Sequence, residues 1–94
     1  MNTKKFGDWL QELEFDVFTG VPCSYLKYLI NYAYSECTYV NSANEGDAVA
    51  VSAGASLAGK RPVVLLQNSG LGNLISPLTS MSHIFKIPFL GFIS

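Results

Sequence analysis

The chain has 94 residues, of which 49% are hydrophobic and only 14% are charged, and its formal net charge is −1. A sequence this apolar is not disordered, and its scattered Lys and Arg residues form no basic stripe of the kind that nucleic-acid binders carry. Because so little charge is unusual for a free monomer of this size, we expect part of its surface to be covered by a partner.

The first residues lack the apolar core of a signal peptide, and no apolar run reaches the about 20 residues that a membrane span needs. We therefore expect a cytoplasmic protein that binds neither membranes nor nucleic acids.

The first half of the chain alternates between helical and strand patterns. Residues 6–13 are amphipathic, and residues 15–22 alternate apolar and polar side chains before a break at Gly20 and Pro22, which predicts a strand and a turn. Apolar residues then recur at helical spacing over residues 25–33, and "TYVNSAN" at residues 38–44 predicts the next strand.

The second half repeats this alternation. A helix is predicted over residues 46–58, with Asn44 as its N-cap, Asp47 three residues on and Gly59 at its end. The run "PVVLLQNSG" from Pro62 holds four consecutive apolar residues, which is typical of a strand buried on both faces.

The last third is predicted as a loop, a broken helix and a strand. "NSGLGN" at residues 68–73 is the glycine-containing loop, and residues 74–85 are the helical segment. We expect Pro77 to break that segment, with Ser76 as N-cap and Pro77 as the first helical residue, because proline inside a helix removes a backbone hydrogen bond. "IPFLGFIS" at residues 87–94 is the fourth strand.

This order predicts an α/β fold, a three-layer parallel sheet with right-handed crossovers and helices on both faces. The sequence ends at Ser94, directly after a predicted strand, where such a domain would place a functional loop. We therefore expect residues 1–94 to be the N-terminal part of a domain that has further strands.

Three loops follow predicted strands, and the site of a parallel sheet lies beyond such strand ends: "GVPCS", "NSANEGD" and "QNSGLGN". The third loop has Ile75 where a dinucleotide fingerprint needs its last glycine, so we expect no Rossmann cofactor. Cys23 and Cys37 lack zinc and redox spacing and are predicted as free thiols, and neither they nor His83 is predicted to be catalytic. Glu45 has an ordinary explanation, since an acid in a first helical turn is stabilised by the helix dipole.

The stretches "FTGVPCSYLKYLIN", "SANEGDAVAVSAGASLAGKRPVVLLQNSGLGNLISPLTSM" and "IPFLGFIS" nevertheless resemble the pyrimidine-binding domain of thiamine-diphosphate-dependent decarboxylases. The resemblance covers roughly residues 15–94. Within the family it is greatest to enzymes that convert phosphonopyruvate to phosphonoacetaldehyde and carbon dioxide. The alternative within the family is the α subunit of sulfopyruvate decarboxylase. The alternative from another class is a non-catalytic flavodoxin-like or Rossmann-like binding module, in which Glu45 only caps a helix.

The resemblance also implies roles for individual residues. Glu45 matches the catalytic and cofactor-binding glutamate, whose carboxyl group, held out of water, hydrogen-bonds the N1′ atom of the aminopyrimidine ring and so promotes loss of the C2 proton of the thiazolium. We expect the loop after the third strand to bind the cofactor and the turn after the first strand to bind the 2-oxo acid. Asn68 and Ser69, in the loop after the third strand, are further candidates for binding the 2-oxo acid. The predicted cofactor-binding residues are Asn68, Ser69, Gly70, Leu71, Gly72 and Asn73, and the predicted substrate-binding residues are Pro22 and Ser24.

The family binds diphosphate and Mg²⁺ through a glycine-aspartate-glycine motif followed later by an asparagine. "GDA" at residues 46–48 lacks the second glycine, and Asn68 follows too soon, so we predict no metal site in this chain. The resemblance implies that Mg²⁺ is held by a diphosphate-binding domain of the same or another chain, in a homo-oligomer. The chain would then supply half of a site.

Overall fold

A computed structural model describes residues 2–94 and contains the predicted alternation of helices and strands. None of the helices within residues 2–94 is both long and apolar enough to cross a membrane. In chain order the helices and strands are α1 (Thr3–Glu12), β1 (Val17–Gly20), α2 (Lys27–Glu36), β2 (Thr38–Asn41), α3 (Glu45–Leu57), β3 (Pro62–Leu66), α4 (Leu71–Pro77) and β4 (Leu90–Ile93).

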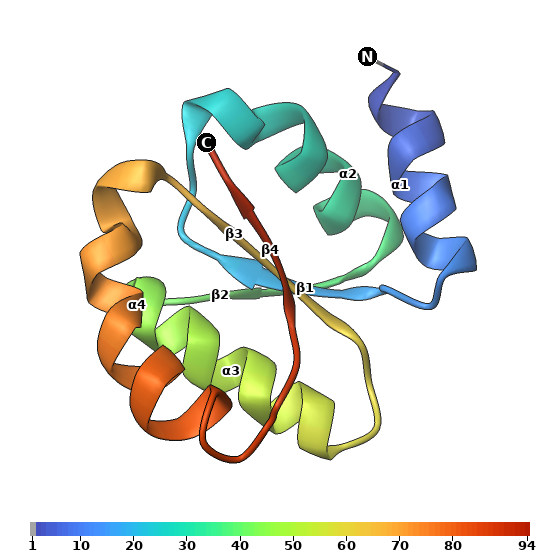
Figure 1. The fold of residues 1–94 in the computed structure, drawn as a ribbon. Coiled ribbons are helices and arrows are strands. Elements are labelled where there is room, and N and C mark those ends of the chain that lie inside the picture. Colours follow the sequence, from blue (N-terminus) through green and yellow to red (C-terminus); the bar gives the residue numbers. More distant parts are fainter. Residues whose placement is uncertain (1) are drawn as a thin grey trace.

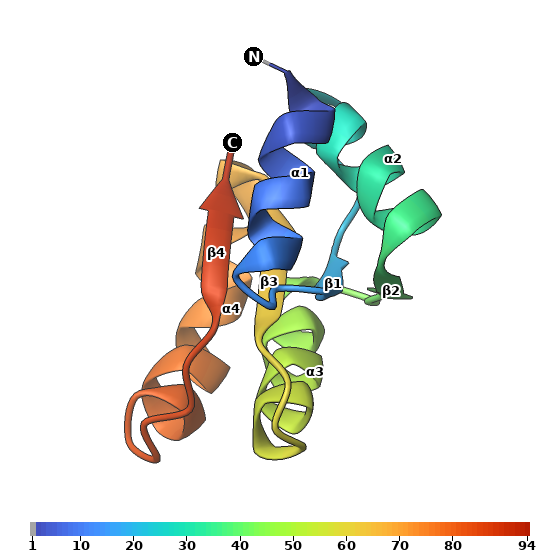
Figure 2. The ribbon, with the colours of Figure 1, turned by 90° about the vertical axis from the view of Figure 1, so that its right-hand side faces the viewer.

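The four strands form one parallel sheet in the order β2-β1-β3-β4. Helices α1 and α2 cover one face, and α3 and α4 cover the other, as Figures 1 and 2 show from two directions. The predicted three-layer fold is therefore confirmed. Because all strands run the same way, their carboxyl ends lie at a single edge, where the connections to the following helices begin.

Each face of the sheet has its own apolar core, and β3 contributes to both. Val63 and Leu65 pack with α1 and α2, whereas Val64 and Leu66 pack with α3 and α4. All five residues of β3 are buried, which explains why its sequence does not alternate. Strand β3 is thus packed on both of its faces, and it holds the connection that follows it in place.

Helix α3 has the predicted N-cap, but it begins at Glu45, one residue before the predicted start. The Asn44 side chain accepts a hydrogen bond of 2.9 Å from the backbone N–H of Asp47, so its prediction as N-cap is confirmed. The Asp47 carboxylate in turn accepts one of 3.0 Å from the N–H of Ala43. These two bonds fix the start of the helix, and Glu45 becomes its first residue, just beyond the end of β2.

The prediction for residues 68–85 was wrong in two respects. The expected loop is helical, because a 3₁₀ turn at Asn68–Gly70 leads directly into α4. Pro77 does not start a helix either: it is the last residue of α4, and a π-helical turn at Leu78–Ser82 follows it.

Two hydroxyl groups link the residues after the proline to the turn before it. The Thr79 hydroxyl donates to the carbonyl oxygen of Ile75 at 2.8 Å, and the Ser80 hydroxyl donates to that of Ser76 at 2.5 Å. These bonds add to the backbone hydrogen bonds of the turn, in which the N–H of Leu78 also donates to the carbonyl oxygen of Ile75. Ser76 therefore supplies a backbone acceptor and is not an N-cap.

Candidate active site

The connections that follow β1, β3 and β4 meet at the carboxyl edge of the sheet. The Cys23 thiol and the Ser94 hydroxyl are hydrogen-bonded at 3.1 Å, and the Asn68 N–H donates to the Ser94 carbonyl oxygen at 3.0 Å. At the end of β1 the Thr19 hydroxyl lies 2.6 Å from that of Ser42, which follows β2. Ser94 therefore joins the connection after β1 to the connection after β3, and Ser42 joins the end of β2 to β1.

Glu45 lies at this edge and contacts the segment that follows β3. Its Oε2 atom accepts a hydrogen bond of 2.8 Å from the side-chain amide of Asn73. Its carboxyl group also packs against Gly70, so closely that a Cβ atom at residue 70 would overlap it. The side chain is half-buried in this chain alone, less than the resemblance implied. Glu45, Gly70 and Asn73, three of the predicted site residues, form one cluster.

Two glycines make this cluster possible, because they allow the first turns of α3 and α4 to approach closely. Gly70 is buried beneath the Glu45 carboxyl group. A Cβ atom at Gly46 would lie 2.8 Å from the carbonyl oxygen of Asn73, which is tighter than real Cβ contacts. The position of the carboxyl group at the start of α3 is also electrostatically favourable, since the N-terminal end of a helix dipole stabilises negative charge.

The remaining residues predicted after β3 are on the surface. Asn68, Ser69 and Gly72 are exposed, and Leu71 is 36% exposed. Several backbone N–H groups of this segment are already used in hydrogen bonds within the chain. The N–H of Asn68 donates to Ser94, that of Gly70 to Gln67, and that of Leu71 to Asn68.

Pro22 and Ser24 are exposed in the connection from β1 to α2, and they line a cavity of about 400 Å³. Lys27 and Asn31 of α2 line it too. The sequence analysis missed these two residues, although their spacing of four places them on one helix face. The lining thus includes a hydroxyl, an amide and an ammonium group, all of which can donate hydrogen bonds to an anion.

Both cysteines are free thiols, as predicted, with Cys23 buried and Cys37 partly buried. The hydrogen bond with Ser94 holds the pKa of Cys23 below its ordinary value, whereas burial raises the pKa of Cys37. Within residues 2–94 no three His, Cys, Asp or Glu side chains are grouped so that they could hold a metal ion. His83 is exposed and follows the π-helical turn.

Comparison with known proteins identifies the family to which the chain belongs. The family described as "Thiamine pyrophosphate enzyme, N-terminal TPP binding domain" matches residues 3–87. The chain is 51% identical over 71 residues to phosphonopyruvate decarboxylase from Streptomyces viridochromogenes, covering 73% of this chain and 18% of that protein. It is 38% identical over 81 residues to sulfopyruvate decarboxylase subunit alpha from Methanococcus maripaludis, covering 84% of this chain and 48% of that protein.

A solved structure gives the same fold. Benzoylformate decarboxylase from Polynucleobacter necessarius matches with a TM-score of 0.86 and 24% identity, covering 98% of this chain and 18% of that one. At this identity the likeness shows the fold alone. The chain spans less than a fifth of the length of the phosphonopyruvate decarboxylase and about half of the sulfopyruvate decarboxylase subunit.

Proposed function

Because the chain belongs to the thiamine pyrophosphate (thiamine diphosphate) enzymes through their N-terminal TPP binding domain, we propose that it supplies the aminopyrimidine-binding half of a decarboxylase site. The observation that carries the proposal is the Glu45 carboxyl group at the carboxyl edge of the sheet, bonded to Asn73 and packed on Gly70. A helix-capping role alone would not require contacts with a segment that follows another strand.

The chemistry of this carboxyl group fits an aminopyrimidine ring. Such a ring presents a nitrogen that can share a proton with a carboxyl oxygen. Asn73 donates to Oε2 of Glu45, and the one ion pair found within residues 2–94 joins Lys4 to Asp8, so Glu45 is not neutralised by a basic side chain. The second oxygen is therefore the candidate partner for the ring nitrogen.

When bound, thiamine diphosphate supplies the carbon nucleophile and the electron sink for decarboxylation. The chain's own residues position the ring and handle one proton. Glu45 holds or shares a proton at the ring nitrogen N1′, and Asn73 keeps the carboxyl group oriented while it does so. Gly70 allows the carboxyl group to pack against the backbone. Because the carboxyl group is half-buried, water competes less well for the same hydrogen bond.

We propose phosphonopyruvate as the 2-oxo acid, with phosphonoacetaldehyde and carbon dioxide as products. The support is the 51% identity to a phosphonopyruvate decarboxylase, compared with 38% to a sulfopyruvate decarboxylase subunit alpha, which is the second candidate. Ser24 would donate a hydrogen bond to the acid, next to Pro22 in the turn after β1. Asn68, Ser69, Leu71 and Gly72 would complete the surface next to the cofactor.

The other half of the site would come from a diphosphate-binding domain that holds Mg²⁺, on the same or another chain of a homo-oligomer. Two observations support this division. The chain covers 18% of one relative and 48% of the other. The acid nearest to Glu45 in sequence, Asp47, already accepts a backbone hydrogen bond at the start of α3.

The test is a decarboxylation assay on the full-length protein that contains these residues. Carbon dioxide release is measured with thiamine diphosphate, Mg²⁺ and equal concentrations of phosphonopyruvate, sulfopyruvate or pyruvate. We expect the highest kcat/KM for phosphonopyruvate. A preference for sulfopyruvate would select the second candidate, and no release from any of the three acids would favour the non-catalytic binding module.

A further inference from the structure

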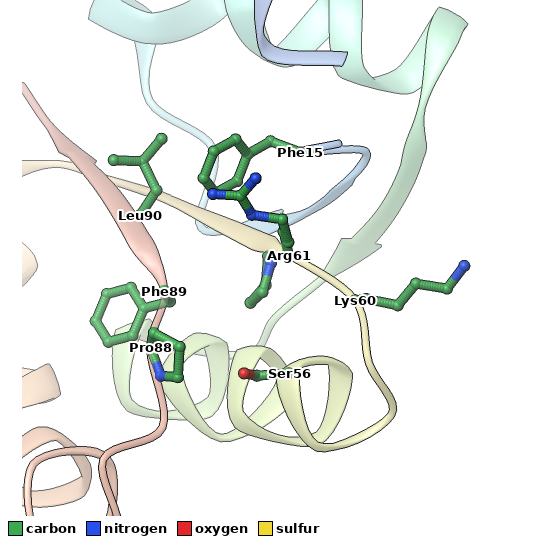
Figure 3. A pocket seen from close by; sticks show the side chains of 8 residues that line it. Phe15, Ser56, Lys60, Arg61, Pro88, Phe89 and Leu90 are labelled. Atoms are coloured by element: carbon green, nitrogen blue, oxygen red, sulfur yellow. The ribbon is translucent and has the colours of Figure 1, made fainter. Parts of the chain in front are cut away.

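A second cavity lies at the opposite end of the strands from Glu45. It has a volume of about 240 Å³ and lies where β1, β3 and β4 begin, next to the last turn of α3. Figure 3 shows its lining: Phe15 and Arg61 lie on one side, Pro88, Phe89 and Leu90 lie across from them, and Ser56 reaches in from α3. Four separate parts of the chain therefore form this cavity.

Arg61 is held in place before any ligand arrives. Its guanidinium carbon lies 4.3 Å from the centroid of the Phe15 ring, a cation–π contact. Its Nη1 atom donates a hydrogen bond of 2.6 Å to the carbonyl oxygen of Leu13. A guanidinium group has about five N–H donors, so most of them stay available for a ligand. Because the side chain is already ordered, a ligand would lose little binding energy in ordering it.

The cavity combines positive charge with apolar walls. Lys60 and Arg61 line it, and no acidic side chain does, although Glu14 and Asp16 flank Phe15 in sequence. Lys60 points away from the other side chains in Figure 3, so Arg61 is the cation that faces a ligand. The wall across from Arg61 consists of a proline, an aromatic ring and a leucine. A ligand that is negatively charged at one end and apolar at the other would therefore match this lining.

We propose that this cavity binds a small organic carboxylate with an aromatic or branched body. The planar fork of Arg61 matches a carboxylate in geometry, and the body of the ligand would lie against Pro88 and Phe89. The cavity of about 240 Å³ has room for a single ring that carries one carboxylate, such as benzoate. Ser56 can donate one further hydrogen bond.

This site is independent of the proposed decarboxylase function. It uses none of Glu45, Gly70 or Asn73, and it lies at the amino ends of the strands rather than the carboxyl ends. A carboxylate bound there would not compete with a ligand at the other edge.

The experiment is a ligand-observed saturation-transfer NMR titration of the full-length protein with benzoate, with benzamide as the uncharged probe of the same shape. Thiamine diphosphate is present in excess, so the other edge is occupied. We expect benzoate to bind and benzamide to bind about tenfold more weakly, because a hydrogen bond to a charged group contributes about that factor. Equal binding of the two probes would overturn the proposal.

Three variants assign the site. Arg61→Gln removes the charge, Ser56→Phe fills the cavity without changing Arg61, and Lys5→Gln removes an exposed cation in α1 as the matched control. We expect benzoate to bind about tenfold more weakly to the first two variants and unchanged to the third. If Arg61→Gln fails to fold, Ser56→Phe decides alone. Unchanged benzoate binding in Ser56→Phe would contradict the site. A fourth variant, Glu45→Gln, should retain benzoate binding, which would separate the site from the proposed function.

Discussion

Replacing Gly70 with alanine is expected to displace the Glu45 carboxyl group, because a Cβ atom at residue 70 would overlap the carboxyl carbon and Oε1 of Glu45. The backbone itself accepts the change. Gly70 has a φ of −92° and a ψ of 0°, which alanine can adopt. The overlap with a side chain is therefore the effect that decides the outcome.

The magnitude follows from what Glu45 loses when it moves. Its 2.8 Å hydrogen bond from Asn73 involves a charged acceptor at a partly exposed position, which makes it worth about 1–2 kcal/mol. The replacement of glycine by alanine stabilises by about 0.4–1 kcal/mol where the backbone is compatible, because it restricts the unfolded chain. We expect Gly70→Ala to lower the free energy of unfolding by about 0.5–1 kcal/mol in the wild-type background.

The sign should reverse when Glu45 is absent. In a Glu45→Ala background the overlap and the hydrogen bond are both gone, so Gly70→Ala should raise the free energy of unfolding by about 0.4–1 kcal/mol. Urea unfolding of the four proteins of this double-mutant cycle measures the difference, provided that the m value stays constant. An equal effect of Gly70→Ala in both backgrounds would refute the contact between Gly70 and Glu45.

Two further predictions concern the fold. Gly20→Ala should lower the free energy of unfolding by about 3 kcal/mol, because its Cβ atom would overlap the backbone carbonyl oxygen of Leu65, which cannot move aside; a urea midpoint close to that of the wild type would contradict this. Burial and the hydrogen bond to Asp8 raise the pKa of Tyr32 to about 12. The pKa of a tyrosine in the unfolded chain is about 10, so between these two values Tyr32 is protonated in the folded protein and ionised in the unfolded one. The resulting stability is present below pH ~10 and is lost as the pH rises from about 10 to about 12. Urea midpoints of wild type and Tyr32→Phe should therefore converge between about pH 10 and 12, and a constant difference would exclude Tyr32 as the cause.

The architecture could be predicted because its signals are local. Consecutive apolar residues identified β3, and Asn44 with Asp47 identified the start of α3. The error at Pro77 arose because the local effect of proline was offset by contacts that sequence spacing does not reveal. Leu74 packs against α3, and the hydroxyls of Thr79 and Ser80 donate to the carbonyl groups of Ile75 and Ser76 in α4.

The candidate site could be located but not assembled from the sequence. The rule that parallel strands share a carboxyl edge placed Glu45 and residues 68–73 in the same region. The contacts of the carboxyl group with Gly70 and Asn73 depend on how closely α3 and α4 approach each other. Glycines at the starts of these helices allow that close approach, and no local pattern indicates their importance. The anchored Arg61 was missed for the same reason, since Leu13 and Phe15 reach it only through the fold.

The central claim, that the Glu45 carboxyl group activates thiamine diphosphate, is tested most directly by exchange of the cofactor's C2 proton for deuterium in the full-length protein with Mg²⁺. Glu45→Gln is compared with wild type and with Glu12→Gln, an exposed glutamate at the end of α1. We predict that Glu45→Gln slows the exchange by about a hundredfold or more and that Glu12→Gln leaves it unchanged. Exchange at the wild-type rate in Glu45→Gln would contradict the account.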